Sequence, residues 1–223
     1  MMKSVGRLRP QSTIFLLCDI QERFREKIWK FGTVANTAKY LVEVAGELNV
    51  KVVATTQYAK ALGAIVPEIN LPVSTEVPAQ DEEGTDTKPP PPPDTPAAVV
   101  YDKKLFSMCT DQVNAELEAA GEGLTSVVLF GIETHVCIQQ TCLDLLSRGL
   151  EVHVVADGCS SQRPYDRGVA LQRMARAGAF VTTAESAVFE LLGTAQHPKL
   201  KAISNLTKAH FQIENDFMGM SSL

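Results

Sequence analysis

The sequence predicts an α/β fold, in which a six-stranded, mostly parallel, doubly wound sheet lies between two layers of helices. Short apolar runs rich in β-branched residues alternate with helix-length amphipathic stretches along most of the 223 residues. This alternation is typical of a parallel sheet covered on both faces. A hydrophobic content of 45% and a charged content of 21% are those of an ordinary globular domain with a substantial core.

The elements follow one another regularly. The run Thr13–Cys18 is apolar on successive residues, which predicts a strand buried on both faces. The expected strands are 13–18, 50–55, 99–101, 126–130, 150–156 and 179–182. The expected helices are 34–48, 137–146, 166–177 and 184–192. In such a sheet, functional residues lie beyond the carboxyl ends of the strands.

The pattern predicts one domain over residues 1–223, with one irregular stretch and a C-terminal tail from about residue 209. Residues 71–97 contain the run Pro89–Pro93 and the acidic residues 81–83, which do not suit a core element. We interpret this stretch as a proline-rich surface insertion. A docking site for a proline-reading partner is the alternative.

Composition argues against several classes of protein. A net charge of −5 and a pI near 5.4 disfavour a nucleic-acid partner, and we find no apolar run long enough to cross a membrane. Five cysteines without a C-x-x-C pair predict neither a disulfide framework nor a structural zinc site, and they suggest a reducing, cytoplasmic location. The basic N-terminus and the ending 221–223, a degenerate Ser-Lys-Leu, leave a mitochondrion or a peroxisome-like organelle as alternatives.

Cys137 is the strongest candidate for a catalytic residue. It lies shortly after Gly131, which follows a buried strand, and the next helix is expected to begin near it. The thiol should therefore lie over unbonded backbone N–H groups at the positive end of a helix, an environment that favours a thiolate. A buried structural cysteine is the competing interpretation.

Two other strand ends supply an acid and a lysine. Asp19 directly follows the first apolar strand, and Lys103 and Lys104 follow the third. Asp19 could accept the thiol proton, while a lysine cation could favour the thiolate and hold the carboxylate. Because neighbouring residues of a strand face opposite sides, only one of the two lysines can point into the site.

Two histidines and an aspartate near these strand ends have simpler interpretations. His135 is two residues from Cys137 and does not face it on a helix, so we expect a turn residue. His153 lies within an expected strand and is interpreted as a core or interface histidine with satisfied hydrogen bonds. Asp157 is expected to cap the turn that follows it.

The motifs together resemble those of the isochorismatase-like cysteine hydrolases. Asp19-x-Gln21-x-x-Phe24, the lysine before Phe106-Ser107, and the segment 131–137 occur in the same order, and the resemblance extends from about Thr13 to Leu192. The resemblance implies the α/β/α fold described above and a catalytic triad of Asp19, Lys103 and Cys137. Of the two adjacent lysines, the spacing before Phe106 selects Lys103. The eukaryotic isochorismatase domain-containing proteins are the most similar subgroup, through the stretch 55–63.

The resemblance implies further features of the site. A non-proline cis peptide bond is expected at Ile132–Glu133, beside backbone amides around Glu133 and Cys137 that could receive an oxyanion. A homo-oligomer, dimer or tetramer, is also implied. The residues expected at the substrate pocket are Gln21, Phe24, Gln57, Tyr58 and Thr134.

One departure narrows the expected activity. Nicotinamidases carry an Asp-x-His metal pair after the second strand, where this chain has Thr56-Gln57-Tyr58. We therefore expect no metal and no cofactor, and hydrolysis of a small amide or related carbonyl compound by Cys137. The alternatives are an interaction protein that uses the proline-rich insertion and, less favoured, a nuclease-type hydrolase.

Overall fold

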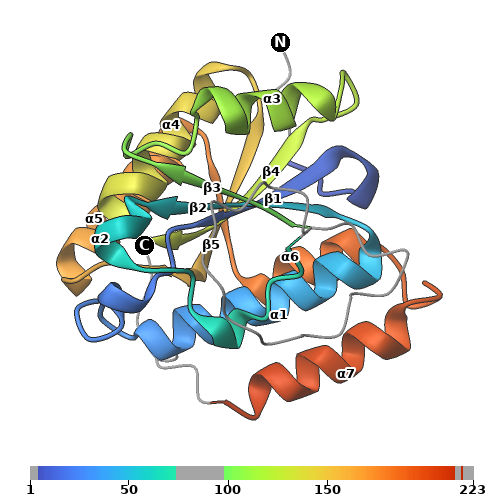
Figure 1. The fold of residues 1–223 in the computed structure, drawn as a ribbon. Coiled ribbons are helices and arrows are strands. Elements are labelled where there is room, and N and C mark those ends of the chain that lie inside the picture. Colours follow the sequence, from blue (N-terminus) through green and yellow to red (C-terminus); the bar gives the residue numbers. More distant parts are fainter. Residues whose placement is uncertain (1–4, 74–97, 214–216, 218–223) are drawn as a thin grey trace.

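The computed structural model describes residues 5–73, 98–213 and 217, and it has a six-stranded parallel sheet at its centre (Figure 1). The strand order is β3-β2-β1-β4-β5-β6, and each neighbouring pair is parallel. The strands are β1 (Thr13–Cys18), β2 (Lys51–Gln57), β3 (Val99–Lys103), β4 (Ser126–Ile132), β5 (Glu151–Ser160) and β6 (Phe180–Thr182). This confirms the predicted three-layer α/β/α fold.

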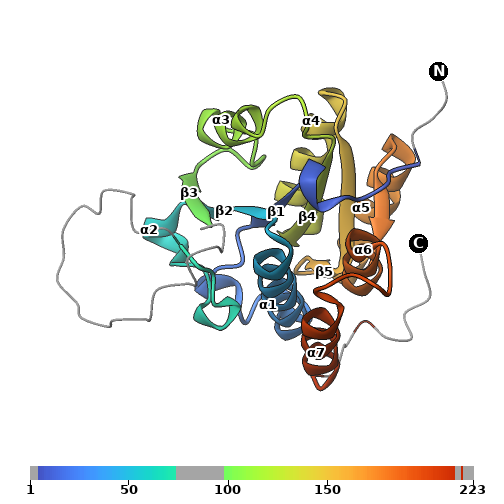
Figure 2. The same ribbon diagram turned by 90° about the vertical axis from the view of Figure 1, so that its right-hand side faces the viewer.

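Helices cover both faces of the sheet. In Figures 1 and 2, α3, α4 and α5 lie on one face, α1 and α6 lie on the other, and α7 packs outside α1. The α-helices are α1 (Phe31–Leu48), α2 (Ala59–Leu62), α3 (Asp111–Ala119), α4 (Gln139–Ser147), α5 (Pro164–Ala177), α6 (Ala184–Leu192) and α7 (Leu200–Phe211). The short turns are η1 (Pro10–Ser12), η2 (Glu22–Phe24), η3 (Pro67–Ile69) and η4 (Thr134–Ile138).

The core lies where the two central strands meet the helices. All six residues of β1 and all seven of β4 are buried, as expected for strands covered on both faces. The rings of Phe15 and Phe130 meet edge to face across these strands, with centroids 6.1 Å apart. Burial of this apolar surface holds the carboxyl ends of β1 and β4 side by side.

The strand order reverses between β1 and β4. From β1 the chain moves outward to β2 and β3, and after β3 it returns to β4 and continues to β5 and β6. The segments that leave β1 and β4 therefore diverge, and this divergence is where doubly wound sheets place their ligands. Asp19 follows β1 at this point, and η4 follows β4.

The structure departs from the sequence-based expectations in several elements. Helices α3 and α7 were not expected, and α7 makes residues 209–211 helical although a tail was expected from about 209. Strand β5 extends beyond 156 to Ser160, because its pairing with β4 resumes after a bulge. Residues 74–97 of the proline-rich insertion lie outside the described part of the chain.

Candidate active site

Asp19 lies at the carboxyl end of β1 in a left-handed backbone conformation, with φ of 54°. Its side chain is buried, and each carboxylate oxygen has a partner. Oδ2 accepts a hydrogen bond from Nζ of Lys103 at 2.7 Å, and Oδ1 accepts one from the hydroxyl of Thr55 at 2.8 Å. The ammonium group thus compensates for the burial of the carboxylate.

Lys103 is the last residue of β3 and points into the site, whereas Lys104 is exposed. Its Nζ also donates to Oε1 of Gln57 at 2.6 Å and to the carbonyl oxygens of Leu105 at 3.1 Å and Phe106 at 3.0 Å. Burial by itself would lower the pKa of Lys103, but the charges of Cys18, Asp19 and Cys137 outweigh burial and raise it. The lysine is therefore a fixed cation.

Cys137 lies within η4, a single π-helical turn, and its side chain is almost fully buried. Its Sγ is 3.8 Å from Nζ of Lys103. The helical segment begins at Thr134, so Cys137 is not its first residue, in contrast to the sequence-based expectation. The carbonyl of Glu133 accepts hydrogen bonds from the amides of Val136 and Ile138, on either side of Cys137. A cis peptide bond lies at Ile132–Glu133, immediately before η4.

Gly131 allows the turn that carries Cys137 to lie against β1. It has φ of 129°, and a Cβ placed on it would be 2.1 Å from the carbonyl oxygen of Cys18. Only glycine suits both this backbone conformation and this close approach. Glycine at this position therefore allows the close approach of β4 to β1, and this approach brings Cys137 near Asp19.

The turn from Glu133 to His135 is held by the end of β5. The Glu133 carboxylate accepts hydrogen bonds from the backbone amide of Gln162 at 2.9 Å and from its side chain at 3.1 Å. Nδ1 of His135 lies 2.9 Å from the hydroxyl of Ser161. His135 is thus engaged with the β5 end of the site, as a turn residue would be.

Gln21 uses its side-chain amide on the backbone around it. Its Nε2 donates to the carbonyls of Gln57 at 3.2 Å and Gly63 at 2.6 Å, and its Oε1 accepts from the amide of Gln57 at 2.8 Å. The side chain is fully buried. Gln21 therefore ties the segment after β2 to the segment after β1.

Replacing Gln21 by glutamate is expected to destabilise the protein by about 2 kcal/mol, because two partly buried carbonyls lose their donor and face a buried carboxylate. Urea unfolding of the variant measures this loss. The matched control is Glu22→Gln, an exposed change at the next residue, which we expect to alter stability by less than about 1 kcal/mol. Equal effects of the two substitutions would contradict the assignment.

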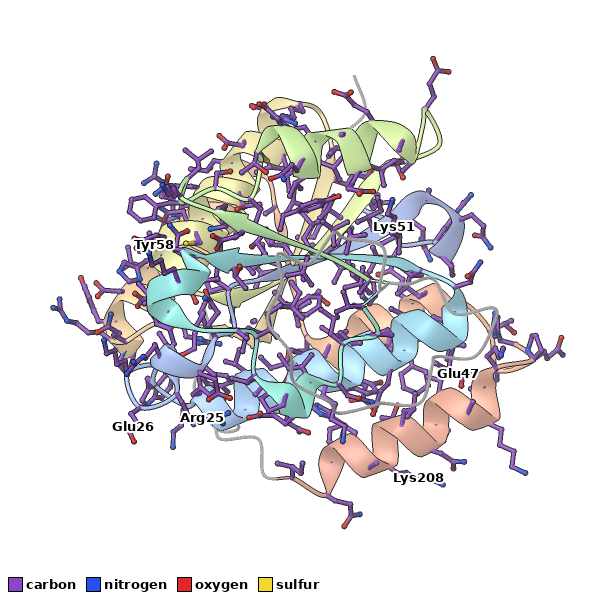
Figure 3. All side chains as sticks on the ribbon, viewed as in Figure 1. Arg25, Glu26, Glu47, Lys51, Tyr58 and Lys208 are labelled. Carbon is purple, nitrogen blue, oxygen red and sulfur yellow. The ribbon has the colours of Figure 1, made fainter. Side chains whose placement is uncertain are left out.

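The other expected pocket residues surround the triad in different ways. Gln57 holds Lys103 through Oε1 and donates through Nε2 to the carbonyl of Lys104 at 3.0 Å. Tyr58 is 45% exposed and lies beside α2 (Figure 3), and Phe24 packs against the edge of the core. Thr134 is fully buried, and its hydroxyl has no hydrogen-bond partner among the described residues.

Cys18 is a site residue that the sequence analysis did not identify. Its Sγ lies 3.4 Å from Oδ2 of Asp19. Burial raises the pKa of the Cys18 thiol well above its usual value, and the hydrogen bond with Cys137 and the charge of Asp19 raise it further. Its position next to Asp19 in the sequence could have indicated a site residue. However, a cysteine at the end of an apolar strand is equally typical of the hydrophobic core.

One donor set could hold a metal ion in this region. One atom each of Cys18, Asp19 and Cys137 lies within 4.8 Å of the other two, and the described residues contain no other such group of histidine, cysteine or acidic donors. Two sulfurs and an oxygen are donors that zinc accepts. The ammonium group of Lys103, 2.7 Å from the Asp19 carboxylate, already occupies the position of a cation there.

Two residues outside the site differ from expectation. His153 is buried and stacks on Phe180 with centroids 4.9 Å apart, but its Nε2 has no hydrogen-bond partner in the described part of the chain. The prediction of satisfied hydrogen bonds was therefore wrong, and burial lowers the pKa of this imidazole. Asp157 accepts a hydrogen bond at 2.9 Å from the amide of Ala184, the first residue of α6, whose N-cap is Thr183, so it also binds an element far along the chain.

Comparison with curated proteins finds extensive similarity. The chain is 41% identical over 215 residues to the secreted isochorismatase effector Isc1 of Phytophthora sojae, covering 96% of this chain and 93% of that protein. It is 44% identical over 205 residues to isochorismatase domain-containing protein 1 of Salmo salar, which covers 92% of this chain. The match spans 64% of the length of the salmon protein.

Solved structures share the fold. The MAR1 ribonuclease of Caenorhabditis elegans aligns with a TM-score of 0.78 at 32% identity, covering 97% of this chain and 98% of that one. The Escherichia coli YcaC protein, described as an octameric hydrolase of unknown specificity, aligns with a TM-score of 0.70 at 20% identity, covering 96% and 100%. At 20% identity the second similarity shows the fold alone.

The isochorismatase domain family matches residues 13–186, a span that contains every strand of the sheet and all three members of the buried Asp–Lys–Cys cluster. This match and the curated relatives agree with the architecture of the structure. The chain belongs to the isochorismatase family and has its hydrolase fold.

Proposed function

We propose that this protein is a cysteine hydrolase that cleaves a small amide or a related carbonyl compound. The observation that carries the proposal is the buried cluster in which Lys103 contacts both the Asp19 carboxylate, at 2.7 Å, and the Cys137 thiol, at 3.8 Å. A nucleophile, a base and a fixed cation at one sheet end are the components of covalent acyl transfer.

The chemistry begins at the thiol. Asp19 accepts the proton of Cys137, and the thiolate attacks the carbonyl carbon of the substrate. The protonated Asp19 then delivers that proton to the leaving amine, which leaves an acyl group on the sulfur. A water molecule activated by Asp19 hydrolyses the thioester and restores the thiol.

Backbone groups around η4 are positioned to receive the oxyanion. The hydrogen bonds from Val136 and Ile138 to the Glu133 carbonyl organise the turn on either side of Cys137. The cis peptide bond at Ile132–Glu133 immediately precedes this turn. We assign the amide of Cys137, together with the turn from Ile132 to Glu133, to stabilisation of the tetrahedral intermediate.

The test is a screen of small amides and esters in which mass spectrometry detects an acyl adduct on Cys137. We expect an adduct and turnover from the wild type, and neither from Cys137→Ala. Cys142→Ala is the matched control, because Cys142 is also a buried thiol, lies on α4 directly after η4, and its replacement should leave both intact. Full turnover by Cys137→Ala would overturn the proposal.

Thr134 offers a polar contact for the substrate. Its buried hydroxyl has no partner in the described ranges, and it lies three residues before the nucleophile. Thr134→Val should keep or slightly raise the free energy of unfolding, since an unsatisfied hydroxyl is removed, while turnover falls by about tenfold if one hydrogen bond to substrate is lost. Unchanged kcat and KM would show that the hydroxyl does not contact the substrate.

A second candidate function is cleavage of RNA, because a structure 32% identical to this chain is described as a ribonuclease. The net charge of −5 disfavours a polyanionic substrate. Incubation of labelled RNA with protein purified from two different hosts decides between the candidates. Cleavage that is lost in Asp19→Asn and Cys137→Ala would favour the nuclease, and intact RNA would favour the amide hydrolase.

The remaining expectations concern assembly and location. A homo-oligomer fits the exposed side chains of Leu105 and Phe106 beside the site, which are 54% and 51% exposed in the single chain. Light scattering in solution measures the subunit number. All five cysteines are free thiols, which fits the cytoplasmic location that we propose. None of the helices in the described ranges is long and apolar enough to span a membrane.

A further inference from the structure

Two thiols meet at the carboxylate of Asp19. The sulfur of Cys18, at the end of β1, and the sulfur of Cys137, in η4, lie within 4.8 Å of each other and of an Asp19 oxygen. Hydrolysis as proposed above uses one thiol, so the second has no role in it. Cys109, Cys142 and Cys159 are also free thiols, but none of them belongs to the cluster around Asp19.

We propose that Cys18 and Cys137 are a covalent modification site, at which a hydroperoxide converts the two thiols to a disulfide bond. This inference rests on the proposed function in one respect, because it needs Cys137 to react as a nucleophile. The disulfide removes that nucleophile reversibly, and a thiol reductant restores it.

The first step takes place at Cys137. Its side chain is 6% exposed whereas that of Cys18 is 0% exposed, so an oxidant meets Cys137 first. The Lys103 ammonium group lies 3.8 Å from its sulfur and donates to it, and Asp19 accepts the thiol proton as in the proposed hydrolysis. The thiolate attacks one peroxide oxygen, the O–O bond breaks, and the leaving oxygen takes a proton and departs as water or an alcohol. Cys137 is thereby oxidised by two electrons to a sulfenic acid.

The second step uses Cys18 as the resolving thiol. Its S–H group points to Oδ2 of Asp19, at a sulfur–oxygen distance of 3.4 Å, so the carboxylate is placed to accept the thiol proton. Asp19 accepts the proton, the Cys18 sulfur attacks the sulfenyl sulfur, and the S–O bond breaks. The departing hydroxide takes the proton back from Asp19 and leaves as water. In total, two thiols and one hydroperoxide give a disulfide, an alcohol or water, and a further water.

The local backbone lets the two sulfurs approach. A disulfide bond is about 2.05 Å long, so the side chains must rotate toward each other from their present separation. Gly131 brings the β4 end against the backbone of Cys18, with which it is in register. Cys18 is the last residue of β1, and Cys137 lies in η4, which leads directly into α4 at Gln139, so each thiol lies near an end of the regular structure that carries it.

The experiment oxidises the full-length protein with one equivalent of hydrogen peroxide in the presence of EDTA, which prevents a metal ion from bridging the thiols. Trypsin leaves Cys18 on residues 8–23 and Cys137 on residues 105–148, and Glu-C then cleaves after Glu133. In the Cys142→Ser variant the two resulting fragments carry one cysteine each. We expect a linked pair of fragments that has lost two hydrogen atoms and that dithiothreitol separates, in the wild type and in Cys142→Ser alike.

Cys18→Ala and Cys18→Ser are the diagnostic variants, with thermal unfolding as the check that each has folded. Without a resolving thiol, Cys137 should proceed to sulfinic and sulfonic acids, so dithiothreitol no longer restores its alkylation by iodoacetamide. Over-oxidised Cys137 with free Cys18 in the wild type would overturn the inference, as would a link that involves Cys142 or Cys159. A Cys137 inert to both iodoacetamide and peroxide would instead overturn the proposed function.

Discussion

Lys103→Met is expected to lower the free energy of unfolding by about 3–5 kcal/mol, because it leaves the Asp19 carboxylate buried without its cation. Both side chains are almost fully buried, with side-chain exposures of 0% for Lys103 and 1% for Asp19. Urea unfolding measures the effect. Lys104→Met is the matched control at the exposed neighbouring position, and we expect it to change stability by less than about 0.5 kcal/mol.

The double variant Asp19→Asn/Lys103→Met separates stability from catalysis. Removal of both charges should restore most of the lost stability, since neither charge is then left unpaired. Alkylation of Cys137 and any turnover should nevertheless stay low, because the base and the cation are both gone. Recovery of activity together with stability would contradict the catalytic roles assigned to the pair.

The same pair has a predictable dependence on pH. The pKa of Lys103 is raised in the folded protein, so its contribution to stability is fully present below the pKa of an unfolded lysine, about 10.4. It is lost as the pH rises through the higher folded pKa. The stability difference between the wild type and Lys103→Met should therefore hold at neutral pH and shrink only as the pH rises above about 10.4.

Gly131→Ala is expected to destabilise the protein by more than about 4 kcal/mol, an effect at the upper end for a single substitution. The new Cβ would lie 2.1 Å from the carbonyl oxygen of Cys18, and the backbone conformation itself disfavours a side chain. Because the obstacle is backbone, no rotamer change relieves it. Thermal and chemical unfolding measure the loss, and slow alkylation of Cys137 would report displacement of η4 in any folded fraction.

Gly168→Ala is the control for that substitution. Gly168 lies within α5, and apart from its own helix backbone no atom of the described residues lies within 4 Å of the position that a Cβ would take. Alanine there should raise stability by about 0.5–1 kcal/mol, through its better helix propensity. A Gly131→Ala variant as stable as Gly168→Ala would contradict the close approach of β4 to β1.

Local patterns were sufficient to predict the elements that carry the candidate site. The apolar runs of β1 and β4 are buried over their whole length, and such runs are recognisable because every residue is apolar. Asp19 and Cys137 then follow at fixed distances from these strand ends. The choice of Lys103 over Lys104 came from the motif spacing before Phe106, and strand alternation required that only one of the two face the site.

Elements with weak local signals were missed or cut short. α7 lies beyond the last strand and packs on α1. Its apolar face could be interpreted as a buried helix face only when α1 is known to be its partner. From the sequence, β5 was expected to end before Asp157-Gly158, because this pair is typical of a turn. Its continuation depends on pairing of Cys159 with Gly131, a contact between distant parts of the chain.

The sequence by itself determined the α/β/α class, the order of the six strands along the chain and three residues of the candidate site, because these follow from local periodicity and from motifs at fixed spacing. Only the tertiary structure decided that Cys18 lies beside the Cys137 thiol and that Gln21 binds backbone around Gln57. Both contacts join residues that are far apart in the chain. Such contacts form only when the sheet and its turns pack together, and the hydrophobic periodicity of the sequence does not predict them.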